Sequence, residues 1–89
     1  MSSTATKPIR LSAHACEQLA YRGASEAEVA ETIRAASWQS AELGRRECRK
    51  TFSYGGTWHG KPYQLKEVRP IFADEPEEIV VVTVYVYYR

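Results

Sequence analysis

The chain has 89 residues, 44% of them hydrophobic and 26% charged, and a net charge of +1 at pH 7. These values are typical of one small globular domain, and no run approaches the ~20 apolar residues that a membrane-spanning helix needs. The first seven residues contain no apolar segment, which argues against a secretory signal. We therefore expect a mobile tail over 1–8 and one cytoplasmic domain over 9–89, with no contact with a membrane.

The first half of the chain predicts a short strand followed by a helical hairpin. Ile9–Leu11 is a candidate strand, and Ser12 suits the N-cap of a helix that ends at Gly23, a residue that readily takes the left-handed conformation after a helix. A capping box at 25–28 then begins a second helix, which ends near position 36. The expected buried residues are Ala15, Cys16, Leu19 and Ala20 in the first helix, and Val29, Ala30, Ile33 and Ala36 in the second.

The second half is rich in β-branched and aromatic residues. After a loop over 37–44, in which Trp38 folds back onto the core, the segments 48–54 and 62–73 are strand candidates. The pair Gly55-Gly56 and then Gly60 indicate turns. Pro70 predicts a kink or a place at a sheet edge, because proline has no backbone N–H to donate. The acidic segment 74–78 is an expected turn.

The clearest strand is the C-terminal segment 79–89. Its even positions from 80 to 88 are apolar, and Thr83, Tyr85, Tyr87 and Arg89 occupy odd positions. A period of two indicates a strand with its even side chains in the core. A strand as apolar as this one would promote aggregation if it lay at an open sheet edge. We therefore expect it to lie between 62–73 and either Ile9–Leu11 or a second subunit. The predicted class is α+β, a helical hairpin on one face of a three- to four-stranded antiparallel sheet, in the order (β)ααβββ.

The two cysteines, Cys16 and Cys48, are interpreted as small buried thiols. A zinc site that combines them with His14 and His59 is rejected. Positions 14 and 16 of one helix point about 200° apart and cannot share a metal. We expect no metal and no cofactor.

The charges are unevenly distributed, because 45–69 holds seven Lys or Arg residues against two Glu. Such a cluster is typical of a phosphate-binding surface or, equally, of a solvated sheet face. In that segment Glu67 and Arg69 share one face of the strand and Lys66 takes the other. Arg69 is thereby expected on the open sheet face with Thr83, Tyr85 and Tyr87.

The first helix carries a polar stripe of His14, Gln18 and Arg22 at positions i, i+4 and i+8. A histidine in the first turn lies at the positive end of the helix dipole, which favours the neutral imidazole that can act as a base. The alternative is a histidine that orders the start of the helix or packs on the sheet.

The spacing His14-Ala-x-x-Gln-Leu-x-x-Arg22-Gly-x-Ser25-x-x-x-Val29, followed by Lys61-Pro-Tyr, Lys66-x-Val68 and Val82-Thr83-Val84-Tyr85, resembles the DUF4258 family over most of the chain. These small domains are similar to toxins of the RelE/ParE type. The resemblance implies a RelE-like fold and a toxin-like RNA-binding domain, a metal-independent endoribonuclease of a toxin–antitoxin system. The implied partners are RNA or the ribosome and an antitoxin protein, and a homodimer is a further candidate.

By position, His14 and Arg22 match the family's histidine and arginine in the first helix, and Thr83 and Tyr85 match its last-strand motif. The expected catalytic residues are His14, Arg69 and Tyr85, and those expected to bind RNA or phosphate are Arg22, Arg49, Lys61, Lys66 and Tyr87. In that reaction the ribose 2′-OH attacks the adjacent phosphate, His14 or a tyrosine takes the proton, and cations stabilise the phosphorane. The alternative is a non-catalytic binding module that uses the same face. Catalysis requires His14, Arg69 and Tyr85 to converge on one phosphate.

Overall fold

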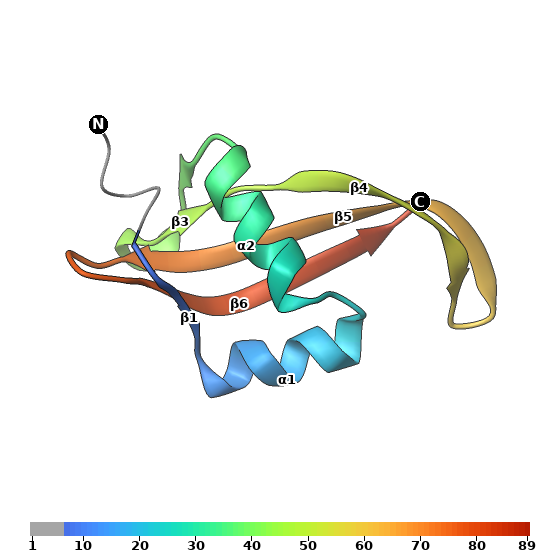
Figure 1. Cartoon of the computed structure of the whole chain (residues 1–89), viewed down its shortest axis with the longest axis horizontal. Coiled ribbons are helices and arrows are strands. Elements are labelled where there is room, and N and C mark those ends of the chain that lie inside the picture. The colour runs from blue at the N-terminus through green and yellow to red at the C-terminus, as the bar shows by residue number, and fades with distance from the viewer. Residues whose placement is uncertain (1–6) are drawn as a thin grey trace.

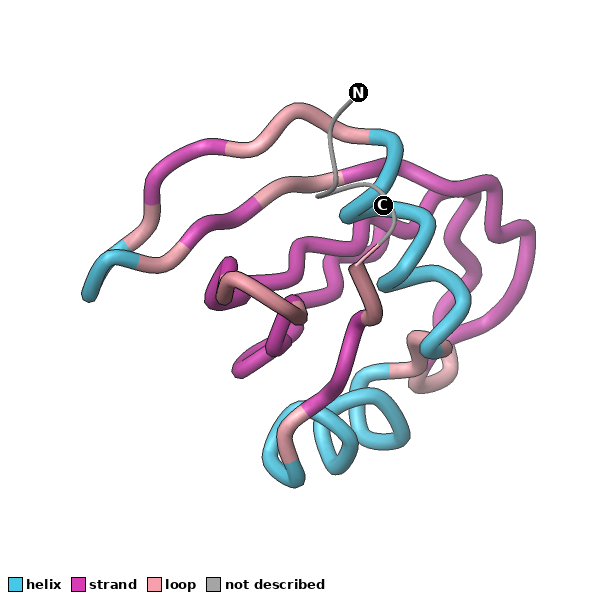
Figure 2. The backbone as a smooth tube through the Cα atoms, turned by 60° about the vertical axis from the view of Figure 1, so that its left-hand side comes forward, coloured by secondary structure: helices cyan, strands magenta, loops and turns pink. Residues whose placement is uncertain are grey.

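The computed structural model describes residues 7–89, and in it two helices pack on one face of a mixed six-stranded sheet (Figures 1 and 2). The predicted α+β class is confirmed, whereas positions 1–6 of the expected mobile tail lie outside the described residues. The elements in chain order are β1 (Ile9–Leu11), α1 (Ala13–Arg22), α2 (Glu26–Ala35), β2 (Gln39–Ser40), a 3₁₀ turn (Glu42–Gly44), β3 (Arg46–Glu47), β4 (Lys50–Trp58), β5 (Lys61–Asp74) and β6 (Ile79–Tyr88).

β6 has a neighbouring strand on both sides only over Ile79–Val81, so its predicted place between two strands is confirmed for these first residues alone. β1 pairs with its first residues in parallel, and β5 pairs with its whole length in antiparallel orientation. On the other side of β5, β3 pairs with the C-terminal half and β4 with the N-terminal half. The expected purely antiparallel sheet of three to four strands is therefore corrected to a mixed sheet. β2 and β3 are only two residues long, too short to leave a periodic pattern in the sequence.

Of the two turns predicted from glycines in the second half, the one at Gly60 is confirmed and the one at Gly55-Gly56 is wrong. Gly55 and Gly56 lie inside β4, where a shift in the pairing with β5 absorbs them, and the chain reverses only at His59 and Gly60. Both of these residues have positive φ angles, 50° and 81°. β4 is consequently longer than expected, and its hairpin with β5 extends toward the end of α1.

Both predicted helix starts are confirmed. The Ser12 hydroxyl accepts a hydrogen bond from the Ala15 amide, and Ser25 and Glu28 form the reciprocal bonds of the capping box. Gly23 follows α1 in the left-handed conformation with φ of 81°. Trp38 is partly buried against the core as predicted, in an edge-to-face contact with Phe72.

The buried face of α1 differs from the prediction. Cys16 and Ala20 are exposed, and the residues that face the sheet are Ala15, Gln18 and Leu19. Cys48, in contrast, is buried as expected, and burial raises the pKa of its thiol to about 12. The helix is rotated so that Gln18 and Arg22 of the polar stripe, and not Cys16, meet β6.

The alternation in β6 changes partway along the strand. Ile79, Val81 and Val84 are fully buried, whereas Val80 and Val82 are only partly buried. The cause is a bulge: Ile71 pairs with Thr83, but the next residue of β5, Phe72, pairs with Val81. One extra residue in a strand moves all side chains beyond it to the opposite face. The prediction that all even positions face the core is therefore wrong before the bulge and holds after it.

Pro70 lies in the middle of β5, between β6 and the β3–β4 side, so its expected place at an edge or a kink is corrected. It is paired with Val84, whose N–H and C=O both point away from β5, toward α1. On its other side only the Pro70 carbonyl is used, by the Cys48 amide at 3.4 Å. Proline fits because its missing N–H faces the break between β3 and β4.

Candidate functional site

Two arginines and two tyrosines gather on and beside the open face of the sheet. The Tyr85 ring has the Arg22 guanidinium 5.0 Å from its centre and the Arg69 guanidinium 5.5 Å from it. Arg22 comes from α1 on one side of β6 and Arg69 from β5 on the other, so the ring lies between two cations. The Tyr87 hydroxyl accepts a hydrogen bond from Arg69 at 3.2 Å. We call Arg22, Arg69, Tyr85 and Tyr87 the arginine–tyrosine cluster.

Glu47 holds Arg69 in place. The Arg69 Nε donates to the Glu47 carboxylate at 2.6 Å, and this hydrogen bond lowers the pKa of Glu47. The carboxylate is only 15% exposed, so the pair is poorly screened by water. Arg49 lies 3.9 Å from the same carboxylate on the solvent side. Glu47 therefore fixes one guanidinium of the cluster.

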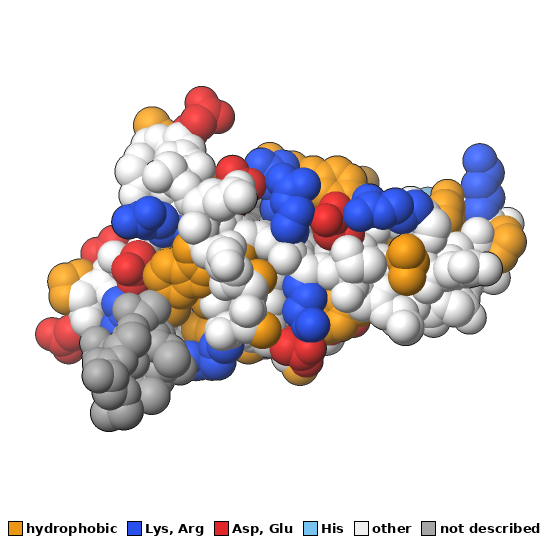
Figure 3. Space-filling view, turned by 90° about the horizontal axis from the view of Figure 1, so that it is seen from above, with side chains coloured by type: hydrophobic (Ala, Val, Ile, Leu, Met, Phe, Trp, Pro, Cys, Tyr) orange, Lys and Arg blue, Asp and Glu red, His pale blue; other side chains and the backbone are white. Residues whose placement is uncertain are grey.

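The basic segment 45–69 does not form one unbroken positive surface. On the open face Arg89 pairs with Glu67 at 3.3 Å, beside the Glu47 pairs with Arg49 and Arg69. On another face of the molecule, acidic side chains lie among the lysines and arginines (Figure 3). The local excess of arginine at the cluster, and not the total charge, is what favours an anion there.

The polar stripe of α1 has a structural role that the sequence did not reveal. The Gln18 side chain accepts a hydrogen bond from the Val84 amide at 2.8 Å, and Arg22 donates to the Val84 carbonyl at 2.8 Å. These side chains replace the strand that β6 lacks on this side after β1 ends. Leaving such buried backbone groups unpaired costs about 1–3 kcal/mol each. The edge of β6 is thus closed by α1 at Val84, and Arg22 is positioned by the same bond.

His14 is exposed and stands apart from the cluster. It precedes Arg22 by two turns of α1, which is about 12 Å along the helix axis. It lines a hollow of about 610 Å³ along α1 that also reaches Tyr21 and Arg22. Within 7–89 no hydrogen bond, ion pair or ring contact joins it to Arg69 or Tyr85. The structure therefore brings Arg69 and Tyr85 together, and the α1 residue beside them is Arg22 and not His14.

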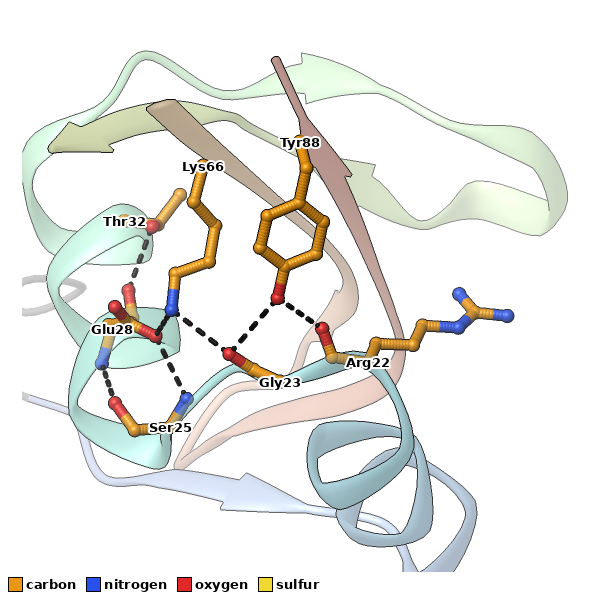
Figure 4. Close-up of polar contacts among 7 residues, drawn as sticks. All are labelled: Arg22, Gly23, Ser25, Glu28, Thr32, Lys66 and Tyr88. Atoms are coloured by element: carbon orange, nitrogen blue, oxygen red, sulfur yellow. Dashed lines mark hydrogen bonds and ion pairs between the residues drawn. The ribbon is translucent and has the colours of Figure 1, made fainter. Parts of the chain in front are cut away.

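Lys66 lies on the helical face of the sheet, as the strand alternation predicted. Its side chain is 8% exposed, and its Nζ donates to the Gly23 carbonyl and to Glu28, each at 2.9 Å (Figure 4). Lys66 thus ties β5 to the turn between the helices and is turned away from the cluster. Of the other expected phosphate-binding residues, Arg49 is exposed beside Glu47 and Lys61 is exposed at the β4–β5 turn.

Replacing Lys66 with methionine is expected to lower the free energy of unfolding by about 2–4 kcal/mol, because Glu28 and the Gly23 carbonyl lose a largely buried partner. Chemical denaturation followed by circular dichroism measures this loss. Lys61→Met is the control, since Lys61 is an exposed lysine of the same strand, and its stability should change by less than about 0.5 kcal/mol. Equal losses in the two variants would contradict the structural role of Lys66.

A second hollow, of about 350 Å³, lies where the end of α1, the β4–β5 turn and the end of β6 meet. We call it the edge hollow, and its lining residues are Tyr21, Arg22, Trp58, His59, Tyr85, Val86 and Tyr88. Trp58 stacks on Tyr88 with ring centres 4.8 Å apart, and His59 lies 4.6 Å from Trp58. Tyr21, Trp58 and His59 were not predicted as residues of this site, because only the length of the β4–β5 hairpin brings them together.

No group of three or more His, Cys, Asp or Glu side chains in 7–89 is arranged to hold a metal ion. Over the same residues no helix is long and apolar enough to cross a membrane. In comparisons with known proteins, no family model, no curated protein and no solved structure matches this chain. The resemblance to DUF4258 stays a prediction.

Proposed function

We propose that this domain binds single-stranded RNA with one phosphate held at the arginine–tyrosine cluster, in the manner of the RelE/ParE-type toxins to which the DUF4258 family, which its sequence resembles, is similar. The observation that carries the proposal is the pair of guanidiniums on either side of Tyr85. Arg22 uses only one terminal nitrogen within the described chain, and Arg69 leaves one terminal nitrogen without a partner. Each can donate to phosphate oxygens, the geometry for which arginine is best suited.

The reaction that suits this arrangement is metal-independent cleavage of RNA. The ribose 2′-OH attacks the adjacent phosphorus while the phenolate form of Tyr85 takes its proton, and the 5′-oxygen leaves with a proton from water, whose hydroxide then removes the proton from the Tyr85 phenol. The products are a 2′,3′-cyclic phosphate and a free 5′-hydroxyl. Arg22 and Arg69 stabilise the charge that develops on the phosphorane. We assign the proton transfer to Tyr85 and not to His14, because Tyr85 lies in the cluster and its hydroxyl has no partner among residues 7–89.

The test uses the whole chain and labelled single-stranded RNA in EDTA. We expect binding in the micromolar range or tighter and slow cleavage that EDTA does not stop. Tyr85→Phe is expected to bind RNA as well as the unmutated chain and to cleave it at least 100-fold more slowly. Tyr63→Phe, a tyrosine of the β4–β5 hairpin outside the cluster, is the control and should cleave normally.

The results of this test distinguish a ribonuclease from a module that only binds RNA. Failure of the unmutated chain to bind RNA would contradict the proposed function. Binding without cleavage would favour the non-catalytic module that uses the same face. Full activity of Tyr85→Phe would mean that another residue takes the proton from the 2′-OH. His14 is the first candidate, and a His14→Ala variant should then lose the cleavage activity.

A further inference from the structure

We propose that the edge hollow holds one unstacked nucleobase of the RNA whose phosphate lies at the arginine–tyrosine cluster. This inference rests on the proposed function and adds a second subsite to it. The two sites are adjacent, because Arg22 and Tyr85 belong to both the cluster and the lining of the hollow. A nucleotide can therefore place its phosphate between the arginines and turn its base toward the end of α1.

The walls of the hollow suit a flat aromatic ligand. Its floor is formed by the stacked pair Trp58 and Tyr88, which is fixed because the Tyr88 hydroxyl donates to the Arg22 carbonyl at 2.7 Å. Tyr21 is 81% exposed at its rim and contacts no other ring or cation among the described residues. His59 supplies a further exposed ring. The volume of about 350 Å³ is at the small end of ligand sites, which span about 300–1,000 Å³.

The polar group of the hollow is the backbone of Val86. Residues at alternate positions of an antiparallel strand point their N–H and C=O to the same side. The N–H and C=O of Val84 point toward α1 and are bonded to Gln18 and Arg22. The N–H and C=O of Val86 therefore point to the same side of β6, where no strand pairs with it. No hydrogen bond to them is present in the described part of the chain. They offer one donor and one acceptor side by side, which is what the edge of a nucleobase requires.

An extended peptide is a poorer fit to the same edge. Only the short stretch from Val86 to Tyr88 is free, between Val84, which α1 covers, and the end of the strand. A peptide strand added there gains very few backbone bonds, and the rings around it block a long chain. A base, in contrast, uses one donor, one acceptor and stacking surfaces. Because a base in a duplex is already paired and stacked, the ligand must be single-stranded.

The experiment compares two uncleavable ligands, a labelled 2′-O-methyl hexaribonucleotide and the same backbone without bases. We expect the unmutated chain to bind the intact oligomer roughly ten- to hundredfold more tightly than the baseless one, the range of base–aromatic stacking. The double variant with Tyr21→Gln and His59→Asn should lose most of that difference and bind the baseless oligomer unchanged. Asparagine is chosen because it tolerates the positive φ of His59.

Leu43→Asn is the matched control, since Leu43 is an equally exposed apolar residue with positive φ on another part of the surface. It should leave both affinities unchanged. Equal affinity for the two oligomers overturns the base subsite. The proposed function still stands in that case if Arg22→Gln weakens the binding of both oligomers. If neither oligomer binds, the proposed function fails with it. A duplex that binds as tightly as the single strand also overturns the inference.

Discussion

Alanine in place of Gly23 is expected to lower the free energy of unfolding by about 2–4 kcal/mol. Gly23 has a φ of 81°, which costs an L-residue roughly 1 kcal/mol. A Cβ there would also lie 2.5 Å from the Tyr88 hydroxyl oxygen and 2.6 Å from the Trp58 ring. Overpacking of this kind typically adds about 1–3 kcal/mol. Neither neighbour can yield easily, because the two rings are stacked on each other.

Gly60→Ala separates the cost of the positive φ from the cost of overpacking. Gly60 has the same φ of 81°, but nothing lies within 4 Å of the position of its Cβ. The free energy of unfolding of this variant should fall by only about 1 kcal/mol, the cost of the positive φ. Urea unfolding of both variants measures the difference. Similar losses would show that the turn between the helices does not press against Trp58 and Tyr88, and these two rings would then not form the floor of the edge hollow.

A hydrogen bond of the Tyr88 hydroxyl explains why Tyr88 lies so close to Gly23. Burial, together with Tyr54 and Glu28, raises the pKa of Tyr88 to about 12, so the phenol remains protonated at neutral pH. It can therefore donate to the Arg22 carbonyl, one of the free carbonyls at the end of α1 (Figure 4). One side chain of β6 thus caps the helix, and glycine at position 23 is what leaves room for it.

The features that the sequence predicted correctly depend on local chemistry. Ser12 and Ser25 mark helix starts because their hydroxyls satisfy nearby amides, and Gly23 marks an end because of its free φ. The place of Ile79–Val81 between β1 and β5 follows from the hydrophobicity of β6. Each of these signals is complete within a few residues of the chain.

The features that it missed depend on pairing between distant segments. The bulge after Val81 arises from the register of β5 against β6, and Gly55-Gly56 continues a strand because β5 is long enough to pair beyond it. Neither register can be read from the strand's own residues. For the same reason the β4–β5 turn and the end of α1 meet without any common motif, so Trp58 and His59 were not predicted as site residues.

The candidate site was predicted in part. Arg69 and Tyr85 share the open face because they are directly paired across β5 and β6 after the bulge, where the strand alternation holds. Lys66 falls on the other face for the same reason. What the sequence could not give is the distance of His14, which depends on α1 running along the β6 edge so that Arg22, and not the first turn, reaches Tyr85.

Removing the charge of Arg22 or Arg69 with glutamine is expected to weaken RNA binding by about ten- to hundredfold, because a charge-assisted hydrogen bond contributes about 1.5–3 kcal/mol. Each variant should also reduce the slope of log affinity against log salt by about 0.7, the loss of one phosphate contact to a single strand. Fluorescence anisotropy of a 2′-O-methyl oligomer at several salt concentrations measures both quantities.

Arg10→Gln is the control, because Arg10 also forms an ion pair with a glutamate, Glu78, but lies in β1, far from the cluster. It should change neither affinity nor slope. If Arg22 and Arg69 hold the same phosphate, the double variant should lose less than the sum of the two single losses, since a phosphate that has lost one arginine is already poorly held. Strictly additive losses would mean that the two arginines bind different phosphates, and the cluster would then be a track along the RNA backbone without a single reacting phosphate.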